Sequence, residues 1–249
     1  MHNLVLAVKD LDEKNEKRNL KQINEFNEKL YNVVQEIISD NSFPLTVGGD
    51  HIISIASSLA SLQKNKNLGI IWFDAHADYN TYKSSVTGNL HGLPLAVATN
   101  YEKTILSDFH KGPFYNPKNA VIVGGKDIDP WEWSNVLDAG VTVFSTEDIK
   151  KYGIESICKK AFEIASNGTN GVHISLDLDI IDPTVAPDVS VPADNGLNLK
   201  ETYELSNEIV KYSNIIKSAD LVEYNPVFDK DNKTQKLAQE ILTQWINNF

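Results

Sequence analysis

Short apolar segments alternate along this chain with longer stretches in which apolar residues recur at helical spacing. This alternation is typical of βαβ units, which build a parallel sheet covered by helices. We expect strands over Leu4–Val8, Pro44–Val47, Leu68–Phe73, Ala120–Val123, Val141–Phe144, Gly171–Leu178 and Ile215–Val222. We expect helices over Leu20–Ile37, His51–Leu62, Ile154–Ala165, Leu199–Tyr212 and Lys233–Trp245. Because ligands bind beyond the carboxyl ends of parallel strands, polar residues at those ends are the first candidates for a site.

Length and charge narrow the class of protein further. The 249 residues suit one large α/β domain, and residues 1–249 show no repeat or linker that would divide them. A net charge of −11 opposes binding to nucleic acid or to anionic membranes. No apolar run approaches the roughly 20 residues that span a bilayer, and the polar start Met1–Asp12 is unlike a signal peptide. Because the single cysteine, Cys158, cannot form an internal disulfide, these features together favour a cytoplasmic protein.

Two of the expected strands end in a run of alternating polar residues. Asp74, His76 and Asp78 follow one strand, and Asp177 and Asp179 follow another. On an extended chain every second side chain lies on the same side, so each group is expected to converge. An isolated Asp-x-Asp pair is most often a turn or a helix cap, so the prediction depends on the combination.

A third segment, Gly48-Gly49-Asp50-His51, adds a histidine at the turn between a strand and a helix. Buried carboxylates at close range repel one another unless they are protonated or neutralised by cations. Four aspartates and two histidines suit two small divalent cations. Oxygen and nitrogen ligands without a thiolate favour Mn²⁺, with Fe²⁺, Co²⁺, Ni²⁺ and Zn²⁺ as alternatives.

The segments Gly48–His51, Asp74–Asp78 and Ser175–Pro183 resemble, in order, the signatures of the ureohydrolase family of arginases, agmatinases and formimidoylglutamases. The resemblance extends from about Arg18 to the C-terminus. It implies a three-layer α/β/α sandwich with a mainly parallel sheet, and a homo-oligomer, either a trimer or a hexamer. The family also has a further N-terminal segment that contains the first strand of its sheet. We expect this chain to lack that first N-terminal strand and to begin at the family's second strand.

The same resemblance implies a centre of two Mn²⁺ ions bridged by Asp74 and Asp177. The ligands of one ion would be His51, Asp74, Asp78 and Asp177. The ligands of the other would be His76, Asp74, Asp177 and Asp179. Asp50 and Asp182 match motif positions, but we expect them to support turns and not to bind metal.

The segment from Asp78 to Gly92 resembles the arginase branch most closely. That branch implies hydrolysis of L-arginine to L-ornithine and urea by a metal-bridging hydroxide. By position, Asn80, Ser85 and Thr87 would bind the α-carboxylate of the substrate. The residues expected to act in catalysis are His91, which would shuttle a proton, together with Asp78 and Glu223.

Three of these positions also have plainer interpretations. Glu223 follows a buried strand and would receive the guanidinium, and the alternative is a surface glutamate at a strand end. Asp129, within Lys126–Pro130, would face the α-amino group through water, or it would cap a helix that begins at Pro130. Taken alone, His91 would equally suit a structural histidine.

Two positions depart from the family pattern, and one of them leaves the substrate open. Arginases have Gly-Thr-Pro where this chain has Ser190-Val191-Pro192, and Val191 offers no hydroxyl near the guanidinium. This stretch is more similar to the formimidoylglutamase branch. Lys126 replaces an arginine that is frequent in the family, which alters a salt bridge but not the chemistry. The alternatives are therefore a formimidoylglutamase, another guanidino-acid amidinohydrolase, or a non-catalytic metal-binding member of the family.

Overall fold

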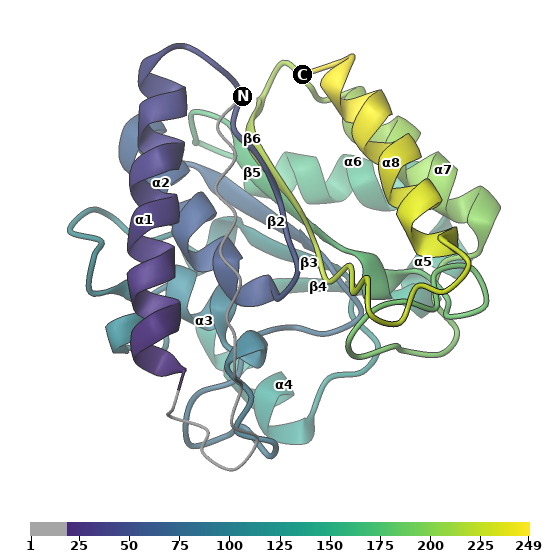
Figure 1. Ribbon diagram of the computed structural model, residues 1–249, viewed down its shortest axis with the longest axis horizontal. Coiled ribbons are helices and arrows are strands. Elements are labelled where there is room, and N and C mark those ends of the chain that lie inside the picture. Colours follow the sequence, from purple (N-terminus) through teal and green to yellow (C-terminus); the bar gives the residue numbers. More distant parts are fainter. Residues whose placement is uncertain (1–18) are drawn as a thin grey trace.

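Six parallel strands form one central sheet in the computed structural model, which describes residues 19–249 (Figure 1). The strand order is β1-β6-β5-β2-β3-β4, and every neighbouring pair runs parallel. The strands are β1 Leu45–Val47, β2 Gly69–Phe73, β3 Ala120–Gly124, β4 Thr142–Ser145, β5 Val172–Asp177 and β6 Ile216–Val222. Each lies within one residue of its predicted bounds. The strand predicted over Leu4–Val8 lies outside the described residues.

Helices cover both faces of this sheet, which confirms the predicted α/β/α sandwich (Figure 1). They are α1 Leu20–Ser39, α2 Ser54–Asn65, α3 Pro94–Ala98, α4 Pro130–Ala139, α5 Thr146–Tyr152, α6 Ile154–Ala165, α7 Leu199–Val210 and α8 Lys233–Ile246. The helix predicted over His51–Leu62 begins instead as a 3₁₀ turn, η1 His51–Ile53. The sequence did not predict α3 or α5 and offered α4 only as an alternative interpretation of Asp129, because none exceeds ten residues and periodicity is weak over so short a stretch.

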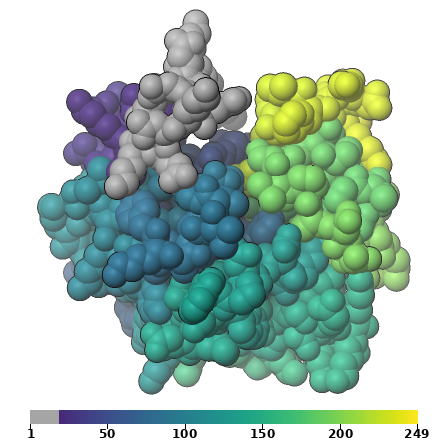
Figure 2. Space-filling model, turned by 90° about the horizontal axis from the view of Figure 1, so that it is seen from below, coloured from purple at the N-terminus to yellow at the C-terminus, as the bar shows by residue number. Residues whose placement is uncertain are grey.

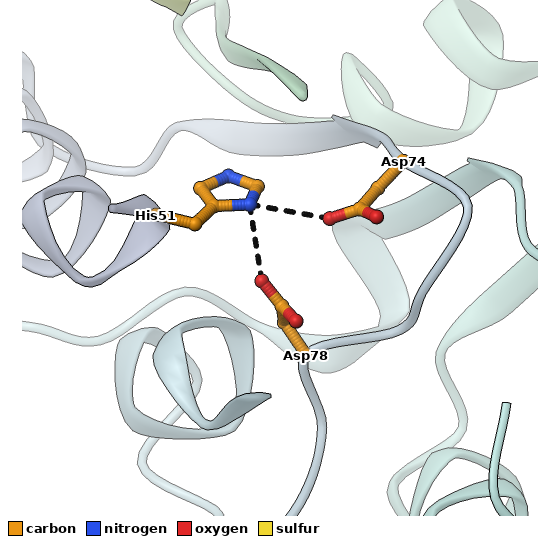
Figure 3. A group of neighbouring side chains, drawn as sticks. All are labelled: His51, Asp74 and Asp78. Carbon is orange, nitrogen blue, oxygen red and sulfur yellow. Dashed lines mark ion pairs between the residues drawn. The ribbon is translucent and has the colours of Figure 1, made fainter. Parts of the chain in front are cut away.

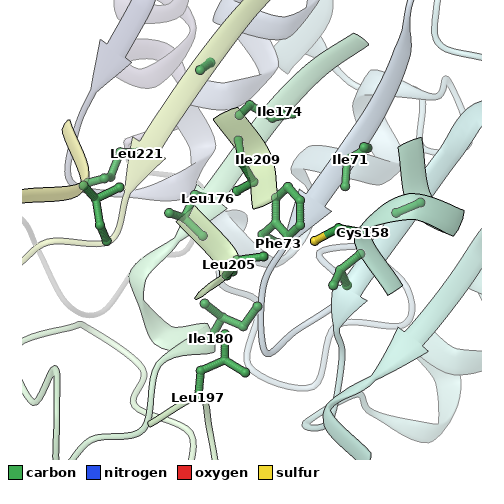
Figure 4. Close-up of a cluster of buried hydrophobic side chains, with 14 of the residues drawn as sticks. Ile71, Phe73, Cys158, Ile174, Leu176, Ile180, Leu197, Leu205, Ile209 and Leu221 are labelled. Atoms are coloured by element: carbon green, nitrogen blue, oxygen red, sulfur yellow. The ribbon is translucent and has the colours of Figure 1, made fainter. Parts of the chain in front are cut away.

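Alternating side chains of β2 show how the two layers form. Ile70 and Trp72 pack into one core with residues of α1, α2 and α3. Ile71 and Phe73 point the other way and pack with α6, α7 and α8 (Figure 4). All four are fully buried, and burying each such side chain stabilises the fold by roughly 1.5–3 kcal/mol. This two-sided burial explains why the strand reads as a continuous apolar run.

The amphipathic C-terminal helix α8 closes one of these layers. Leu237, Ile241 and Trp245 recur on one face and are buried in the same core as Phe73. This apolar stripe therefore docks on the core of its own chain.

The direction in which successive strands are added across the sheet reverses between the central strands β2 and β5. From β2 the chain continues to β3 on one side, and from β5 it continues to β6 on the other. The loops that follow these two neighbours therefore diverge and leave a crevice at their carboxyl ends. Figure 2 shows this face of the molecule, where blue, teal and green parts of the chain meet around a hollow.

Candidate active site

Two matching turns bring the polar residues of β2 and β5 together. Asp74 Oδ1 accepts a hydrogen bond of 2.6 Å from the backbone N–H of His76. Asp177 Oδ1 accepts one of 2.8 Å from the backbone N–H of Asp179. The two strands end at Phe73 and Asp177, so the extended alternation assumed from the sequence stops there. The side chains converge because the chain turns, not because it remains extended.

His51 lies at the centre of the first group of ligand atoms (Figure 3). Its Nδ1 is 3.2 Å from Asp74 Oδ2, 3.1 Å from Asp78 Oδ2 and 2.9 Å from Asp177 Oδ2. All four side chains are buried. Asp78 adopts a left-handed backbone with φ of 51°, which turns its carboxylate back towards His51.

His76 forms the second group with Asp74 and Asp179. Its Nδ1 lies 2.9 Å from Asp179 Oδ2 and 3.5 Å from Asp74 Oδ1. Asp74 therefore belongs to both groups, one oxygen to each. The contacts of Asp177 reach His51 and the backbone of Asp179.

Gly124, at the end of β3, makes room for this arrangement. Its φ is 107°, and a Cβ there would lie 2.8 Å from the backbone oxygen of Asp74 and within 2.7 Å of the Ile180 side chain. Only glycine fits both the conformation and the space.

The cluster requires positive charge. The other nitrogen of His51, Nε2, is 2.8 Å from Ser175 Oγ, and when Nε2 carries the hydrogen of a neutral imidazole, the Nδ1 lone pair faces three carboxylates. Among the described residues, His51 Nδ1 and Asp74 Oδ2 are buried without a hydrogen-bond partner. A cation between them would satisfy both atoms, so the residues present suit bound metal.

The pKa values show the same need for charge. Burial opposes protonation of His76, but Asp179 and Asp74 outweigh it and raise its pKa to about 12. Burial and the charges of Asp179 and Asp74 hold the pKa of Asp177 well above its usual range. Without cations, the cluster would have to take up protons in their place.

A pocket of about 210 Å³ opens beside the cluster. It is lined by nearly every predicted site residue: His51, His76, Asp78, Asn80, Ser85, Thr87, His91, Asp129, Asp177, Asp179 and Glu223. The remaining predicted ligand, Asp74, lies behind it and is fully buried. The structure thus brings all the predicted residues to one place.

The predicted carboxylate-binding residues form one rim of this pocket. Ser85 Oγ accepts a hydrogen bond from the backbone of Gly88, and Thr87 Oγ1 accepts one from the backbone of Asn89. Each hydroxyl keeps its hydrogen for another acceptor. Asn80 Oδ1 accepts from Ser84, which leaves the amide nitrogen of Asn80 as the free end of its side chain.

His91 and Glu223 stand between that rim and the cluster. The carboxylate of Glu223 is held at Oε1 by the backbone N–H of His51, at 2.6 Å, and burial raises its pKa to about 7. The backbone of Glu223 is left-handed, with φ of 65°, a strained conformation for this residue type. Burial opposes protonation of His91, but Asp50, 3.8 Å away, and the charges of Asp78 and Glu223 raise its pKa to about 9.

Asp129 and Glu132 approach the pocket from α4. Asp129 occupies the N-cap position, but its side chain makes no capping hydrogen bond and lines the pocket instead. Glu132 was missed from the sequence. It is buried, accepts a hydrogen bond of 2.9 Å from the backbone of Tyr79, and has a pKa raised by burial to about 8. The only feature of the sequence that could have indicated Glu132 is a carboxylate two residues after Pro130.

The two departures from the family pattern lie at the pocket edge. Val191 lines the pocket. Lys126 Nζ donates to the backbone oxygens of Ala193 and Asp194, both at 2.7 Å, and so ties the loop that carries Val191 to the end of β3. Asp182 accepts from the Thr184 hydroxyl and backbone in an exposed turn, away from the metal-ligand groups.

None of the described helices, from residue 19 onward, is both long and apolar enough to cross a membrane.

Comparison with known proteins identifies the family. The family model described as "Arginase family" matches residues 4–246. An arginase of Bacillus subtilis is 37% identical over 228 residues, which cover 91% of this chain and 76% of the relative. The solved structure of Bacillus caldovelox arginase, at 32% identity, superposes with a TM-score of 0.90 over 99% of this chain and 83% of that one.

A formimidoylglutamase structure from Bacillus subtilis also superposes, with a TM-score of 0.78 over 90% of this chain and 67% of that one. At 21% identity it shares the fold alone. The match of the family model over nearly the whole chain decides the assignment: the chain belongs to the arginase family of metal-dependent hydrolases.

Proposed function

We propose that residues 1–249 form a single catalytic domain that hydrolyses L-arginine to L-ornithine and urea with two Mn²⁺ ions. One observation carries the proposal: a single pocket has a cluster that needs cations at one end and hydrogen-bond donors suited to an anion at the other. L-Arginine has the matching ends, a guanidinium group and an α-carboxylate. The homo-oligomer implied by the family resemblance belongs to the same proposal.

Six side chains would hold the two ions. One ion would take His51, Asp74, Asp78 and Asp177, and the other would take His76, Asp74, Asp177 and Asp179. Carboxylate and imidazole ligands without a thiolate favour Mn²⁺ over softer metals. When bound, the two cations would lower the pKa of water and so supply a nucleophile for the guanidinium carbon.

Glu223 would receive the guanidinium group. Since the His51 backbone fixes one oxygen, the carboxylate has little freedom to rotate, and the guanidinium would meet a preset acceptor. The strained backbone of Glu223 is consistent with a position held for function.

His91 would deliver a proton to the leaving amine. Its raised pKa keeps it protonated near neutral pH, as a general acid must be. Cations in the cluster would offset the charge of Asp78 and bring the pKa of His91 closer to neutrality, where it exchanges protons more readily.

The rim of Asn80, Ser85 and Thr87 would bind the α-carboxylate, and Asp129 would face the α-amino group. Three donors on one side and an acidic group on the other match the two charges of an amino-acid head group. Agmatine lacks the carboxylate and would leave these donors unpaired.

Val191 supports a second candidate, hydrolysis of a formimino or different guanidino acid. It presents methyl groups to the pocket where a threonine hydroxyl would meet the reacting group in an arginase. Both candidate functions would use the same metal-ligand cluster. They differ in the group that position 191 is expected to offer to the reacting part of the substrate.

A substrate panel on the Mn²⁺-loaded protein tests the proposal. We expect urea release from L-arginine with a kcat/KM at least about a hundred times that for agmatine, because a site built to bind a group rejects the analogue without it. Comparable rates on both would contradict the carboxylate pocket. Preferential release of formamide from N-formimidoyl-L-glutamate would establish the second candidate, and two bound ions without turnover of any substrate would indicate a non-catalytic protein.

A further inference from the structure

Three side chains behind the carboxylate rim form a hydrogen-bonded relay that runs from α4 into the pocket. Asn135 Nδ2 donates to Ser84 Oγ at 3.0 Å, and Ser84 Oγ donates to Asn80 Oδ1 at 2.9 Å. Ser84 and Asn135 are half-buried and do not line the pocket, whereas Asn80 is buried and does. The relay therefore reaches the pocket through Asn80 alone.

Backbone groups fix the direction of this relay. Asn135 Nδ2 also lies 3.1 Å from the backbone oxygen of Tyr79, which only accepts, so this end of the Asn135 amide is the nitrogen. The backbone N–H of Thr81, which only donates, points at Ser84 Oγ from 2.8 Å. The Ser84 oxygen is thus an acceptor for Asn135 and for Thr81.

The Ser84 hydrogen then has one acceptor left. The Thr81 hydroxyl, 3.2 Å away, donates its own hydrogen to Ser84 Oγ, and its oxygen accepts from the backbone N–H groups of Lys83 and Ser84, so it offers no acceptor to Ser84. Asn80 Oδ1 is closer and takes the hydrogen. The oxygen of the Asn80 amide is therefore held away from the pocket, and its two N–H groups face the pocket.

We propose that Ser84 and Asn135 are positioning residues that select substrates with a carboxylate by fixing which end of the Asn80 amide faces the pocket. An asparagine amide is nearly symmetric in shape, so packing alone does not distinguish its two orientations. With the oxygen turned inward, Asn80 would repel a carboxylate instead of binding it. This inference rests on the proposed function, since it assigns a control to the carboxylate end of the same pocket.

The first test compares Ser84→Ala with Ser84→Thr in the Mn²⁺-loaded full chain. Ser84→Ala removes the donor to Asn80, and we expect KM for L-arginine to rise about tenfold with kcat nearly unchanged. Agmatine turnover should not change, because agmatine has no carboxylate. Ser84→Thr keeps a hydroxyl and should restore the wild-type KM. Equal losses on both substrates, or no loss on either, would overturn the inference.

The second test reverses the direction of the hydrogen bond between Asn135 and Ser84, where the relay begins. Asn135→Asp cannot donate to Ser84, so the Ser84 hydrogen turns towards the new carboxylate and Asn80 loses its partner. We expect a KM increase for L-arginine larger than that of Ser84→Ala. Ser134→Asp adds the same charge to the exposed neighbouring position of α4 and should leave KM unchanged. If both aspartate variants raise KM equally, simple repulsion explains the effect and the relay does not.

A binding measurement separates this inference from the proposed function. Calorimetry would compare L-ornithine with putrescine, which differ only by the carboxylate, on wild-type and Ser84→Ala protein. We expect an L-ornithine affinity about tenfold weaker in Ser84→Ala and an unchanged putrescine affinity. If the wild type releases no urea from L-arginine, the proposed function fails while this result still upholds the relay. Unchanged L-ornithine affinity in Ser84→Ala would overturn the relay even in an active arginase.

Discussion

The two walls of the pocket are built in different ways. The cluster wall consists of residues at the ends of β2 and β5 together with His51, and its side chains are nearly all buried. The sheet register aligns the two strands, pairing Phe73 with Leu176, so Asp74 and Asp177 leave the sheet side by side. The rim wall lies in the loop from Asn80 to Asn89. Here hydrogen bonds between residues close in sequence fix the orientation of each side chain.

In the proposed function, this difference separates the reaction from the selection of the substrate. Residues fixed by the sheet would act at the reacting carbon, which all substrates of the family share. Loop residues would contact the far end of the substrate, and a loop tolerates change without disturbing the core. Changes in the cluster wall should therefore affect all substrates, and changes in the rim wall should affect only some.

The largest effect is expected from Asp177→Ala in the cluster wall. Asp177 contacts His51 and supports the turn to Asp179, so its loss would remove a proposed shared ligand and disturb a second one. Even partners outside the ligand set typically cost 10- to 100-fold in metal affinity, so we expect a loss above about a hundredfold and no measurable urea release. Metal analysis after dialysis measures this, and full two-ion occupancy would rule out the assignment.

Asp182→Ala is the matched control for that variant. Asp182 belongs to the same sequence motif but lies in an exposed turn with Thr184. Metal content and turnover should remain near wild type.

Glu223→Gln should lower activity on both L-arginine and agmatine. The two substrates share the guanidinium group, and the amide lacks the charge that pairs with it, so kcat/KM should fall roughly ten- to a hundredfold. Glutamine still offers an oxygen to the His51 backbone, so the fold and metal content should persist. A loss confined to L-arginine would show that Glu223 does not receive the guanidinium group.

Asn80→Ala should lower activity on L-arginine alone. Removing one donor to a carboxylate should cost roughly ten- to a hundredfold in kcat/KM, mainly through KM. Weak agmatine turnover and metal content should be unchanged, since Asn80 contacts neither the guanidinium nor the cluster. Parallel losses on both substrates would show that the two walls are not independent.

The smallest effect is expected from Glu132→Gln, measured as the pH dependence of stability in metal-free protein. Burial raises the pKa of Glu132 from 4.5 to about 8, so the folded state favours its protonated form. Its contribution to stability is fully present below about pH 4.5 and is lost as the pH rises towards about 8. Glutamine stays neutral and keeps the hydrogen bond from Tyr79.

The melting temperature of Glu132→Gln should therefore exceed that of the wild type increasingly between about pH 5 and pH 8. A difference that stays constant across this range would argue against a buried, titrating Glu132.

The sequence predicted the cluster wall better than the rim wall for a physical reason. A buried strand that ends in Asp-x-His or Asp-x-Asp is unusual, because burying charge is costly, so Asp74 and Asp177 stood out. The rim residues were named by resemblance to a family motif, since serine, threonine and asparagine occur in most loops. Glu132 and the Ser84–Asn135 relay escaped notice because their partners are backbone groups and side chains that only the fold brings close.

Local sequence patterns predicted the strands and the long helices of the fold. Strands buried on both faces give continuous apolar runs, and their bounds were predicted to within a residue. Periodicity did not predict the short helix α4, because its exposed Trp131, Trp133 and Leu137 break the amphipathic pattern. The order of the strands depends on contacts distant in sequence and was not predicted from periodicity.

The central claim is that the cluster wall holds two manganese ions, and anomalous scattering from crystals of the Mn²⁺-loaded protein tests it most directly. We expect two peaks, one within coordination distance of His51 Nδ1 and one within that distance of His76 Nδ1, with the Asp74 carboxylate between them. A single peak, or two peaks away from these side chains, in protein that releases urea from L-arginine would contradict the account.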